Sequence, residues 1–301
     1  MYLLSMSPKL LGQGSYSCVY DNLVHCSDER EQYEKELPVR IAEKVLFDGE
    51  TAEKELKMGR YLASLPNVHV GKIVGFCNNV KTHALRQNGC SIPSDTTKSI
   101  VFENFGPDAN QVRLTGSEIY ELACILCTSL SSMARYEVVH GDVKPANILV
   151  RQRVGERLEA VLIDFGLTGS FREYASRVRN HAWFDTAQYF PPDGVLVRSH
   201  SFPLYLQHVQ TCARTQNIPA LYLVGAQSVQ PICSNPRILS DKDLAIGHDI
   251  WMFGCALWSL WQRNVGGSVP QWLHQVAFRC FCLDPRQRSW SDIEVILKTF
   301  F

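Results

Sequence analysis

The chain has 301 residues, of which 46% are hydrophobic, and it carries 30 basic and 30 acidic side chains. This composition excludes a disordered chain, and the length is enough for two lobes or one large domain. The balanced charge excludes a global field that would attract nucleic acid or an anionic membrane. The first residues lack the basic start of a signal peptide, and the apolar stretch 250–261 is too short to cross a bilayer.

Eleven cysteines, an odd number, follow no regular spacing. We therefore expect no disulfide framework and an intracellular protein in a reducing compartment, the cytoplasm or the nucleus. Cys124 and Cys127 form a CxxC pair inside an amphipathic helical pattern. Packing on a buried helix face is the favoured interpretation of this pair over a metal or redox site.

Residues 10–20, LLGQGSYSCVY, predict two strands joined by a glycine turn. Gly12 and Gly14 would allow backbone N–H groups to close over phosphates, although a plain hairpin is the alternative. Residues 39–47 predict a strand that contains Lys44. This lysine is either a solvated edge residue or a cation that points into a cleft toward phosphate.

Residues 50–65 predict an amphipathic helix, because leucines form an apolar stripe and acidic residues stand early. One of its glutamates could turn inward to Lys44. Residues 68–104 predict two or three strands joined by a polar loop, and the last strand runs into a Gly–Pro turn. We place a boundary there, which gives two lobes, 1–106 and 107–301.

After a long amphipathic helix at 114–135 comes HGDVKPANILV, residues 140–150, followed by VLIDFG, residues 161–166. Asp142 and Asn147 precede one short apolar strand, and Asp164 follows the next. Two carboxylates and one amide at such strand ends can hold one or two hard divalent cations and leave one carboxylate to orient an attacking hydroxyl. This chemistry favours phosphoryl transfer.

The remaining chain is predicted to be mostly helical. Residues 167–193 form a polar, basic segment for which a solvated loop is the favoured interpretation and recognition of acidic substrates the alternative. Residues 194–246 predict a short helix and loops, and 249–262 a helix that is apolar all round and therefore buried. Two further helices are predicted at 271–282 and 290–301.

Seven segments follow one another along the chain: LGQGSYSCV, IAEK, VHGDVKPAN, IDFG, TAQYFPPD, HDIWMFGC and LDPRQRS. In this order they resemble the eukaryotic protein-kinase family, and the resemblance covers nearly the whole chain. It implies an α+β, bilobal fold with a β-rich N-lobe that has one main helix, a mostly α-helical C-lobe, and an enlarged region at 194–246 after the activation segment. The compact chain is also similar in style to divergent kinases of large DNA viruses, such as those of herpesviruses.

The resemblance implies transfer of the γ-phosphate of ATP to Ser/Thr hydroxyls of protein substrates, with Mg²⁺ as the cation. It implies that Asp142 is the catalytic base and that Lys144 contacts the γ-phosphate. Thr186 would lie against Asp142 and Lys144, as in Ser/Thr kinases. It implies Asn147 and Asp164 as Mg²⁺ ligands.

The resemblance also implies an ATP site. Lys44 would pair with the α- and β-phosphates and be held by Glu55 or, as second choice, Glu53. Phe102 would occupy the gatekeeper position of the linking strand. The other implied positions, from the glycine-rich loop, the adenine sandwich and the linking strand, are Leu11, Gly12, Gln13, Gly14, Ser15, Val19, Ala42, Leu149, Glu103, Phe105 and Asp108.

Three structural roles follow from the same resemblance. Asp193 and Arg288 would form an ion pair, and Asp249 would brace the catalytic loop. His140 would pack and hydrogen-bond rather than act as a base, because Asp142 already holds that role.

The chain departs from the family pattern at two informative positions. Ser17 stands at the third loop glycine, and Gly141 replaces the usual arginine before the catalytic aspartate. Without that arginine, a phosphate on the activation segment lacks its usual clamp. The hypothesis is activity without activation-segment phosphorylation, with the joint replacement of Thr168, Ser170, Tyr174 and Ser176 as its test.

Two other functions stay open at this point. Small-molecule phosphotransferases of the aminoglycoside or choline kinase type also carry HGD, whereas Lys144, TAQYFPPD and Arg288 favour a protein substrate. A non-catalytic pseudokinase scaffold is disfavoured, because the lysine, the two aspartates and the asparagine of the site are all present. The oligomeric state is not indicated by the sequence.

Overall fold

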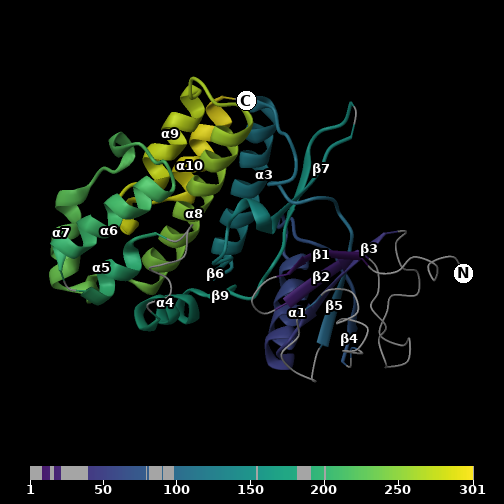
Figure 1. Cartoon of the computed structure of the whole chain (residues 1–301). Helices are drawn as coiled ribbons and strands as arrows, with labels where there is room; N and C mark the ends of the chain where they lie inside the picture. The colour runs from purple at the N-terminus through teal and green to yellow at the C-terminus, as the bar shows by residue number, and fades with distance from the viewer. Residues whose placement is uncertain are drawn as a thin grey trace, which may run out of the picture. The chain divides into compact units, whose positions relative to one another are not determined.

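The computed structural model of the chain describes residues 9–13, 17–21, 40–78, 80, 90, 98–153, 155–181, 191–199 and 201–300 (Figure 1). The chain divides into two compact units. The first unit comprises Met1–Ser64 and Val70–Gly106, and the second comprises Leu65–His69 and Pro107–Phe301. Among the described residues, no helix has the length and apolar character needed to cross a membrane.

In the described part of the first unit, helix α1 (Gly49–Ala63) packs on a five-stranded antiparallel sheet. Asp48 starts this helix, because its side chain accepts the backbone N–H groups of Glu50 and Thr51. The predicted helix at 50–65 and the predicted strands are confirmed here. In sheet order the strands are β1 (Lys9–Gln13), β2 (Ser17–Asp21), β3 (Ile41–Leu46), β5 (Lys98–Glu103) and β4 (Ile73–Cys77).

The strand register decides which side chains share a face of this sheet. Val19 pairs with Lys44, and Ala42 pairs with Phe102. Because paired residues and every second residue point to the same face, these four side chains lie on one side. It is the side that packs on α1 through Leu46, Phe102 and the helix residues Ala52 and Leu56.

The opposite face of the sheet carries a cluster rich in cysteine, formed by Cys18, Tyr20, Val45, Cys77, Val80 and Cys90. Cys18 and Cys90 form a disulfide, and Cys77 is also disulfide-bonded. The prediction of no disulfide framework is therefore wrong for this unit. Sequence spacing could not show it, because Cys18 and Cys90 are 72 positions apart and only the folded chain brings them together. The cysteines thus give no support to the predicted reducing compartment.

Removing the Cys18–Cys90 disulfide should destabilise the protein. The bond closes a loop of 72 residues, and chain entropy predicts that Cys18→Ala with Cys90→Ala lowers the free energy of unfolding by about 4 kcal/mol. Urea denaturation followed by circular dichroism measures this. Cys212→Ala is the control, because Cys212 lies in the second unit and is not disulfide-bonded. Equal stability of the double variant and the control would contradict the prediction.

The second unit is mainly helical, with α8 (Asp241–Asn264) at its centre. Almost every side chain of α8 from Leu244 to Trp261 is buried, and Figure 1 shows its neighbours α3, α9 and α10 packed beside it. The helices predicted at 114–135, 271–282 and 290–301 are confirmed as α3 (Gly116–Arg135), α9 (Gln271–Cys280) and α10 (Trp290–Thr299).

Helix α8 begins eight residues before the predicted start at Asp249. Ser240 and Asp243 form a capping box, in which each side chain accepts the other residue's backbone N–H. The polar sequence DKDLAIGH hid this first part of the helix from the apolar pattern.

Two predicted loop regions are helical. Residues 167–193, expected to be a solvated basic loop, contain α4 (Phe171–Asn180), which starts at a Ser170–Glu173 capping box and packs along α8. Residues 194–246 fold into more than one short helix. They contain α5 (Asp193–Ser199), α6 (Phe202–Thr215), α7 (Ala226–Ser234), the 3₁₀ turns η4 (Ala220–Tyr222) and η5 (Pro236–Ile238), and the start of α8.

Two small sheets position the HGD and DFG sequences. Strand β6 (Val138–Val139) pairs with β9 (Gly169–Ser170), and β7 (Ile148–Arg151) pairs with β8 (Glu159–Leu162). Between β6 and β7 lies the 3₁₀ turn η2 (Pro145–Asn147). The predicted strands around the polar residues are therefore present.

Candidate active site

The ends of β7 and β8 bring two predicted cation ligands to one place. Ile148 is paired with Leu162, and the N–H of Ile163 donates to the carbonyl of Asn147 at 3.0 Å. Asn147 stands just before β7, and Asp164 stands two residues after β8. The antiparallel pairing therefore puts these two residues at the same end of the hairpin.

Asp142 is the centre of a compact polar cluster. Its Oδ2 accepts a hydrogen bond from Lys144 Nζ at 2.6 Å and one from Asn147 Nδ2 at 2.9 Å. Asn147 Nδ2 also donates to the backbone carbonyl of Asp142 at 2.8 Å. Within the described part of the chain no hydrogen bond reaches Oδ1 of Asp142, whose side chain is 17% exposed. One carboxylate oxygen is thus held by two donors and the other is left for a ligand.

The donor set of Asn147 and Asp164 fits Mg²⁺. Because the Nδ2 group of Asn147 is used by Asp142, its amide oxygen is the atom available to a cation. Asp164 adds a carboxylate on a backbone with φ of 67°, the left-handed region that is uncommon for a residue other than glycine. Mg²⁺ usually takes one or two protein oxygens and completes its shell with phosphate and water. The described ranges contain no group of three or more His, Cys, Asp or Glu that could hold a metal, so the proposed ligands here are one amide and one carboxylate.

Asp249 of α8 fixes the backbone before Asp142. Its two carboxylate oxygens accept the N–H groups of His140 and Gly141, each at 2.8 Å. Burial raises the pKa of Asp249 to about 7, and these two hydrogen bonds oppose the shift. The prediction that Asp249 braces this loop is confirmed.

His140 is fully buried, and both of its ring nitrogens are engaged. Nε2 lies 3.1 Å from the carbonyl of Ile163, and Nδ1 accepts the N–H of Asp142 at 3.3 Å. Its ring meets that of Phe165 edge-on at 5.8 Å. Burial lowers the pKa of His140, so the ring is a neutral packing and hydrogen-bonding group, as expected.

The predicted ion pair between Asp193 and Arg288 is confirmed. Arg288 donates to the two carboxylate oxygens at 2.6 and 3.1 Å, and it also donates to the carbonyls of Cys282 and Gly247. Both side chains are fully buried. The guanidinium also lies 5.0 Å from the ring of Trp251. The pair links the start of α5 to α8 and to the segment 282–288 before α10.

Loss of this cation should be costly. Arg288→Ala leaves the Asp193 carboxylate buried without its partner, which should lower the free energy of unfolding by about 3–5 kcal/mol. The matched control is Arg279→Ala, because Arg279 makes an exposed pair with Asp292 at 3.5 Å and should lose less than about 1 kcal/mol. Urea denaturation compares the two variants. Equal losses would show that the buried pair adds nothing beyond a surface pair.

In the first unit, Lys44 is held by Glu55. Its Nζ lies 2.8 and 2.9 Å from the two carboxylate oxygens, and Glu55 is buried. Glu53, the second choice from the sequence, pairs instead with Lys98 on the surface. Helix periodicity explains the difference, because Glu55 lies on the buried face with Ala52 and Leu56.

The adenine-side positions are only partly as expected. The N–H of Glu103 donates to the carbonyl of Lys72 at 2.9 Å, so an adenine contact by Glu103 would use its carbonyl. Phe102 is buried against α1. The carboxylate of Asp108 accepts from the N–H of Asn110 and the side chain of Gln111. Asp108 therefore already caps its own turn, and a ribose contact would compete with these bonds.

The remaining predicted residues are distributed as follows. Leu11, Gly12 and Gln13 lie in the exposed strand β1. Leu149 lies in β7 and itself forms an isolated β-bridge with Asp108, and Phe105 is half-buried in the linking segment. Gly14, Ser15 and Thr186 lie outside the described residues.

Sequence reasoning missed the residues that hold the activation segment. Tyr174 of α4 is fully buried against Gly141, and Thr168 donates to the carbonyl of His140 at 2.9 Å. Arg177 donates to the carbonyl of Leu167 at 2.7 Å, and Arg179 contacts Asp241 and the carbonyl of Leu239. Two of the three arginines of this segment are thus structural. The one signal in the sequence was Gly141. A glycine in place of the usual arginine leaves a volume that another side chain can fill.

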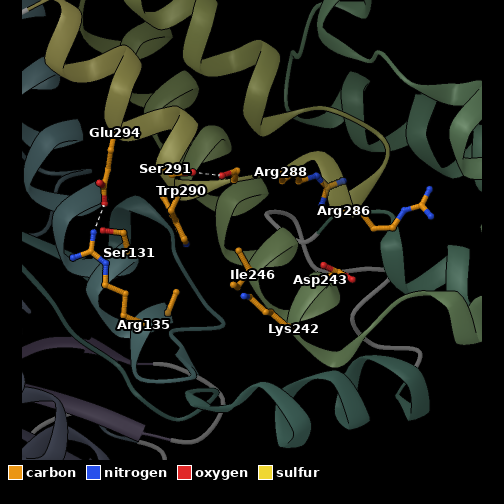
Figure 2. A pocket seen from close by; sticks show the side chains of 12 residues that line it. Ser131, Arg135, Lys242, Asp243, Ile246, Arg286, Arg288, Trp290, Ser291 and Glu294 are labelled. Atoms are coloured by element: carbon orange, nitrogen blue, oxygen red, sulfur yellow. Dashed lines mark hydrogen bonds and ion pairs between the residues drawn. The ribbon is translucent and has the colours of Figure 1, made fainter.

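A separate cavity of about 410 Å³ lies in the second unit between α3, α8 and α10 (Figure 2). Most of its cations have partners: Arg135 with Glu294 at 3.2 Å, Arg286 with Asp284 at 2.7 Å, and Arg288 with Asp193. None of the predicted catalytic or ATP-binding residues lines it. Its lining is Ser131, Ala134, Arg135, Lys242, Asp243, Ile246, Arg286, Arg288, Ser289, Trp290, Ser291 and Glu294.

Comparison with known families matches residues 6–204 to the protein kinase domain. The match spans more than half of the chain and includes the Lys44–Glu55 pair, the Asp142 cluster and Asp164. The chain therefore belongs to the protein kinase family, a family of ATP-dependent phosphotransferases. No curated protein sequence matches the chain.

Proposed function

We propose that this kinase transfers the γ-phosphate of ATP to Ser and Thr hydroxyls of protein substrates, with Mg²⁺ as cofactor. The observation that carries the proposal is the Asp142 carboxylate, which has Lys144 and Asn147 on one oxygen and no described partner on the other. Such a group can receive a substrate hydroxyl at hydrogen-bonding distance.

In this mechanism Asp142 orients the acceptor hydroxyl and takes its proton. The hydroxyl oxygen forms a bond to the γ-phosphorus, while the bond from that phosphorus to the β–γ bridging oxygen breaks and ADP leaves. Lys144 contributes positive charge beside Asp142 as negative charge spreads over the transferred group. Asn147 and Asp164 hold Mg²⁺, which when bound neutralises charge on the phosphates.

Nucleotide binding is assigned to the residues that the resemblance implies. Lys44, oriented by Glu55, pairs with the α- and β-phosphates. Val19 and Ala42 lie on the same face of the sheet as Lys44, which supports their assignment to the adenine ring together with Leu149. In this proposal the strand glycine Gly12 covers the phosphates together with Gly14 and Ser15, which lie outside the described residues.

The preference for Ser and Thr rests on Lys144 and Thr186. A lysine two residues after the catalytic aspartate, with a threonine at the end of the activation segment, is the Ser/Thr kinase pattern. Arg177 and Arg179 do not add an acidic-substrate patch, because both are engaged by neighbouring groups of the protein.

A peptide-library assay with Mg–ATP tests the activity and the acceptor residue together. We expect transfer to Ser and Thr peptides, and Asp142→Asn should lower kcat by about 10²–10⁴-fold because it removes the general base. Glu156→Gln is the matched control, since it makes the same carboxylate-to-amide change in the exposed β7–β8 turn, and it should keep full activity.

Three results would contradict the proposal. Transfer to an aminoglycoside but not to peptides would indicate a small-molecule phosphotransferase. Transfer to tyrosine peptides alone would refute the Ser/Thr preference. Full activity of Asp142→Asn would remove this residue from the role of base.

Activity should not require a phosphorylated activation segment. Gly141 supplies no cation for such a phosphate, and Thr168 and Tyr174 are fully buried. The joint replacement of all four hydroxyl residues is therefore a poor test, because Thr168 and Tyr174 are structural and Ser170 caps α4.

Phosphatase treatment is the sharper test of this independence. The treated enzyme should keep kcat within about twofold of the untreated enzyme, a difference of less than about 0.5 kcal/mol in activation free energy. Mass spectrometry verifies that phosphate is gone. A loss of tenfold or more on treatment, restored by incubation with Mg–ATP, would show that phosphorylation is required.

A further inference from the structure

Gly141, directly before Asp142, has no room for a side chain. Its φ is +79°, and a Cβ built there would lie 2.4 Å from Cε2 of Tyr174 and 2.9 Å from the carbonyl oxygen of Leu167. Real Cβ atoms do not approach other atoms this closely. The ring of Tyr174 therefore occupies the volume that a side chain at position 141 would need, and the positive φ also favours glycine.

Tyr174 reaches this position from α4. It is fully buried, and its hydroxyl donates to the carbonyl oxygen of Gly141 at 3.3 Å. The hydroxyl oxygen also lies within hydrogen-bonding distance, 3.3 Å, of Nδ1 of His248. A His248 ring protonated on Nδ1 donates to the tyrosine oxygen, so the hydroxyl makes both bonds. Burial lowers the pKa of His248 well below its usual value and raises that of Tyr174, so both groups are neutral.

The ring of Tyr174 is held from two further sides. His248 meets it edge-on, with ring centroids 5.6 Å apart. The guanidinium of Arg177, one turn along α4, lies 5.4 Å from the ring centroid and donates to the carbonyl of Leu167 at 2.7 Å. A single helix face thus contacts both the residue before Asp142 and the residue after the DFG glycine.

Both polar groups of Gly141 are consequently fixed. Its N–H is held by Asp249 of α8 at 2.8 Å, and its carbonyl is held by Tyr174 of α4. That carbonyl belongs to the peptide unit that leads into Asp142. Since a peptide unit is planar, fixing its oxygen also fixes the direction of the Asp142 N–H, which donates to Nδ1 of His140.

We propose that Tyr174 is a positioning residue that sets the orientation of Asp142 through the Gly141–Asp142 peptide, and that it thereby couples the catalytic loop to the folding of α4. The neutral aromatic ring fills the place of the missing side chain at 141, and the coupling is built into the fold without any added phosphate. This inference rests on the proposed role of Asp142.

The test is Tyr174→Phe, which keeps the ring and removes the hydroxyl. We expect kcat to fall about fivefold, the effect of one lost hydrogen bond, with the KM for ATP unchanged. The melting temperature should fall by no more than about 2–4 °C. Ser176→Ala is the control, because Ser176 lies on the exposed side of the same helix, and it should leave kcat unchanged. A Tyr174→Phe enzyme with wild-type kcat overturns the proposal.

A second readout does not depend on activity. Hydrogen exchange of a peptide spanning 140–143 should be faster in Tyr174→Phe than in wild type, while peptides from α10 exchange at equal rates. If the wild type transfers no phosphate, the proposed function fails, and the hydrogen-exchange comparison alone tests whether Tyr174 positions the loop. Faster exchange at 140–143 then supports the positioning role, and unchanged exchange overturns it.

A double-mutant cycle tests the shared volume. Gly141→Ala should cost more kcat in the wild-type background than in Tyr174→Ala, by at least about threefold, because the second variant removes the ring that a Cβ would meet. Equal costs in the two backgrounds would show that the ring does not constrain position 141, which overturns the inference.

Discussion

The catalytic loop depends on one buried carboxylate. Asp249, in the middle of the most buried helix of the second unit, accepts the N–H groups of His140 and Gly141. A loop of small and polar residues has little packing of its own, so two charge-assisted bonds from a rigid helix set its path. The cost is visible in the pKa of Asp249, which burial raises to about 7. Asp249 holds the backbone of His140 and Gly141, and this backbone sets the positions of Asp142, Lys144 and Asn147.

Other contacts in the second unit hold α8 and the helix α4 in place. Arg288 and Asp193 join three separate parts of the chain through a fully buried ion pair, and α4 lies along α8. In the first unit a buried carboxylate again orients a polar side chain, because the ammonium of Lys44 donates to both oxygens of Glu55. Lys44 is thus oriented by a partner on a regular helix, and such preorganisation suits phosphoryl transfer.

Gly141 and Tyr174 show how a departure from a family pattern can be compensated. The sequence presents Gly141 as a loss, the absence of an arginine. In the fold, the position is filled by a tyrosine from α4, whose hydroxyl bonds the glycine carbonyl. The activation segment is in this way attached to the catalytic loop by neutral, buried groups.

The sequence by itself determined the motif order, the kinase family, the strand ends that carry Asn147 and Asp164, and the Asp193–Arg288 pair. The motif order and the strand ends follow from local patterns along the chain, whereas the family and the Asp193–Arg288 pair follow from the resemblance that the motifs carry. Only the tertiary structure decided which glutamate meets Lys44, that Cys18 joins Cys90, that 167–193 contains a helix, and that Tyr174 fills position 141. Each of these depends on which faces are buried against which, and a linear pattern does not record that.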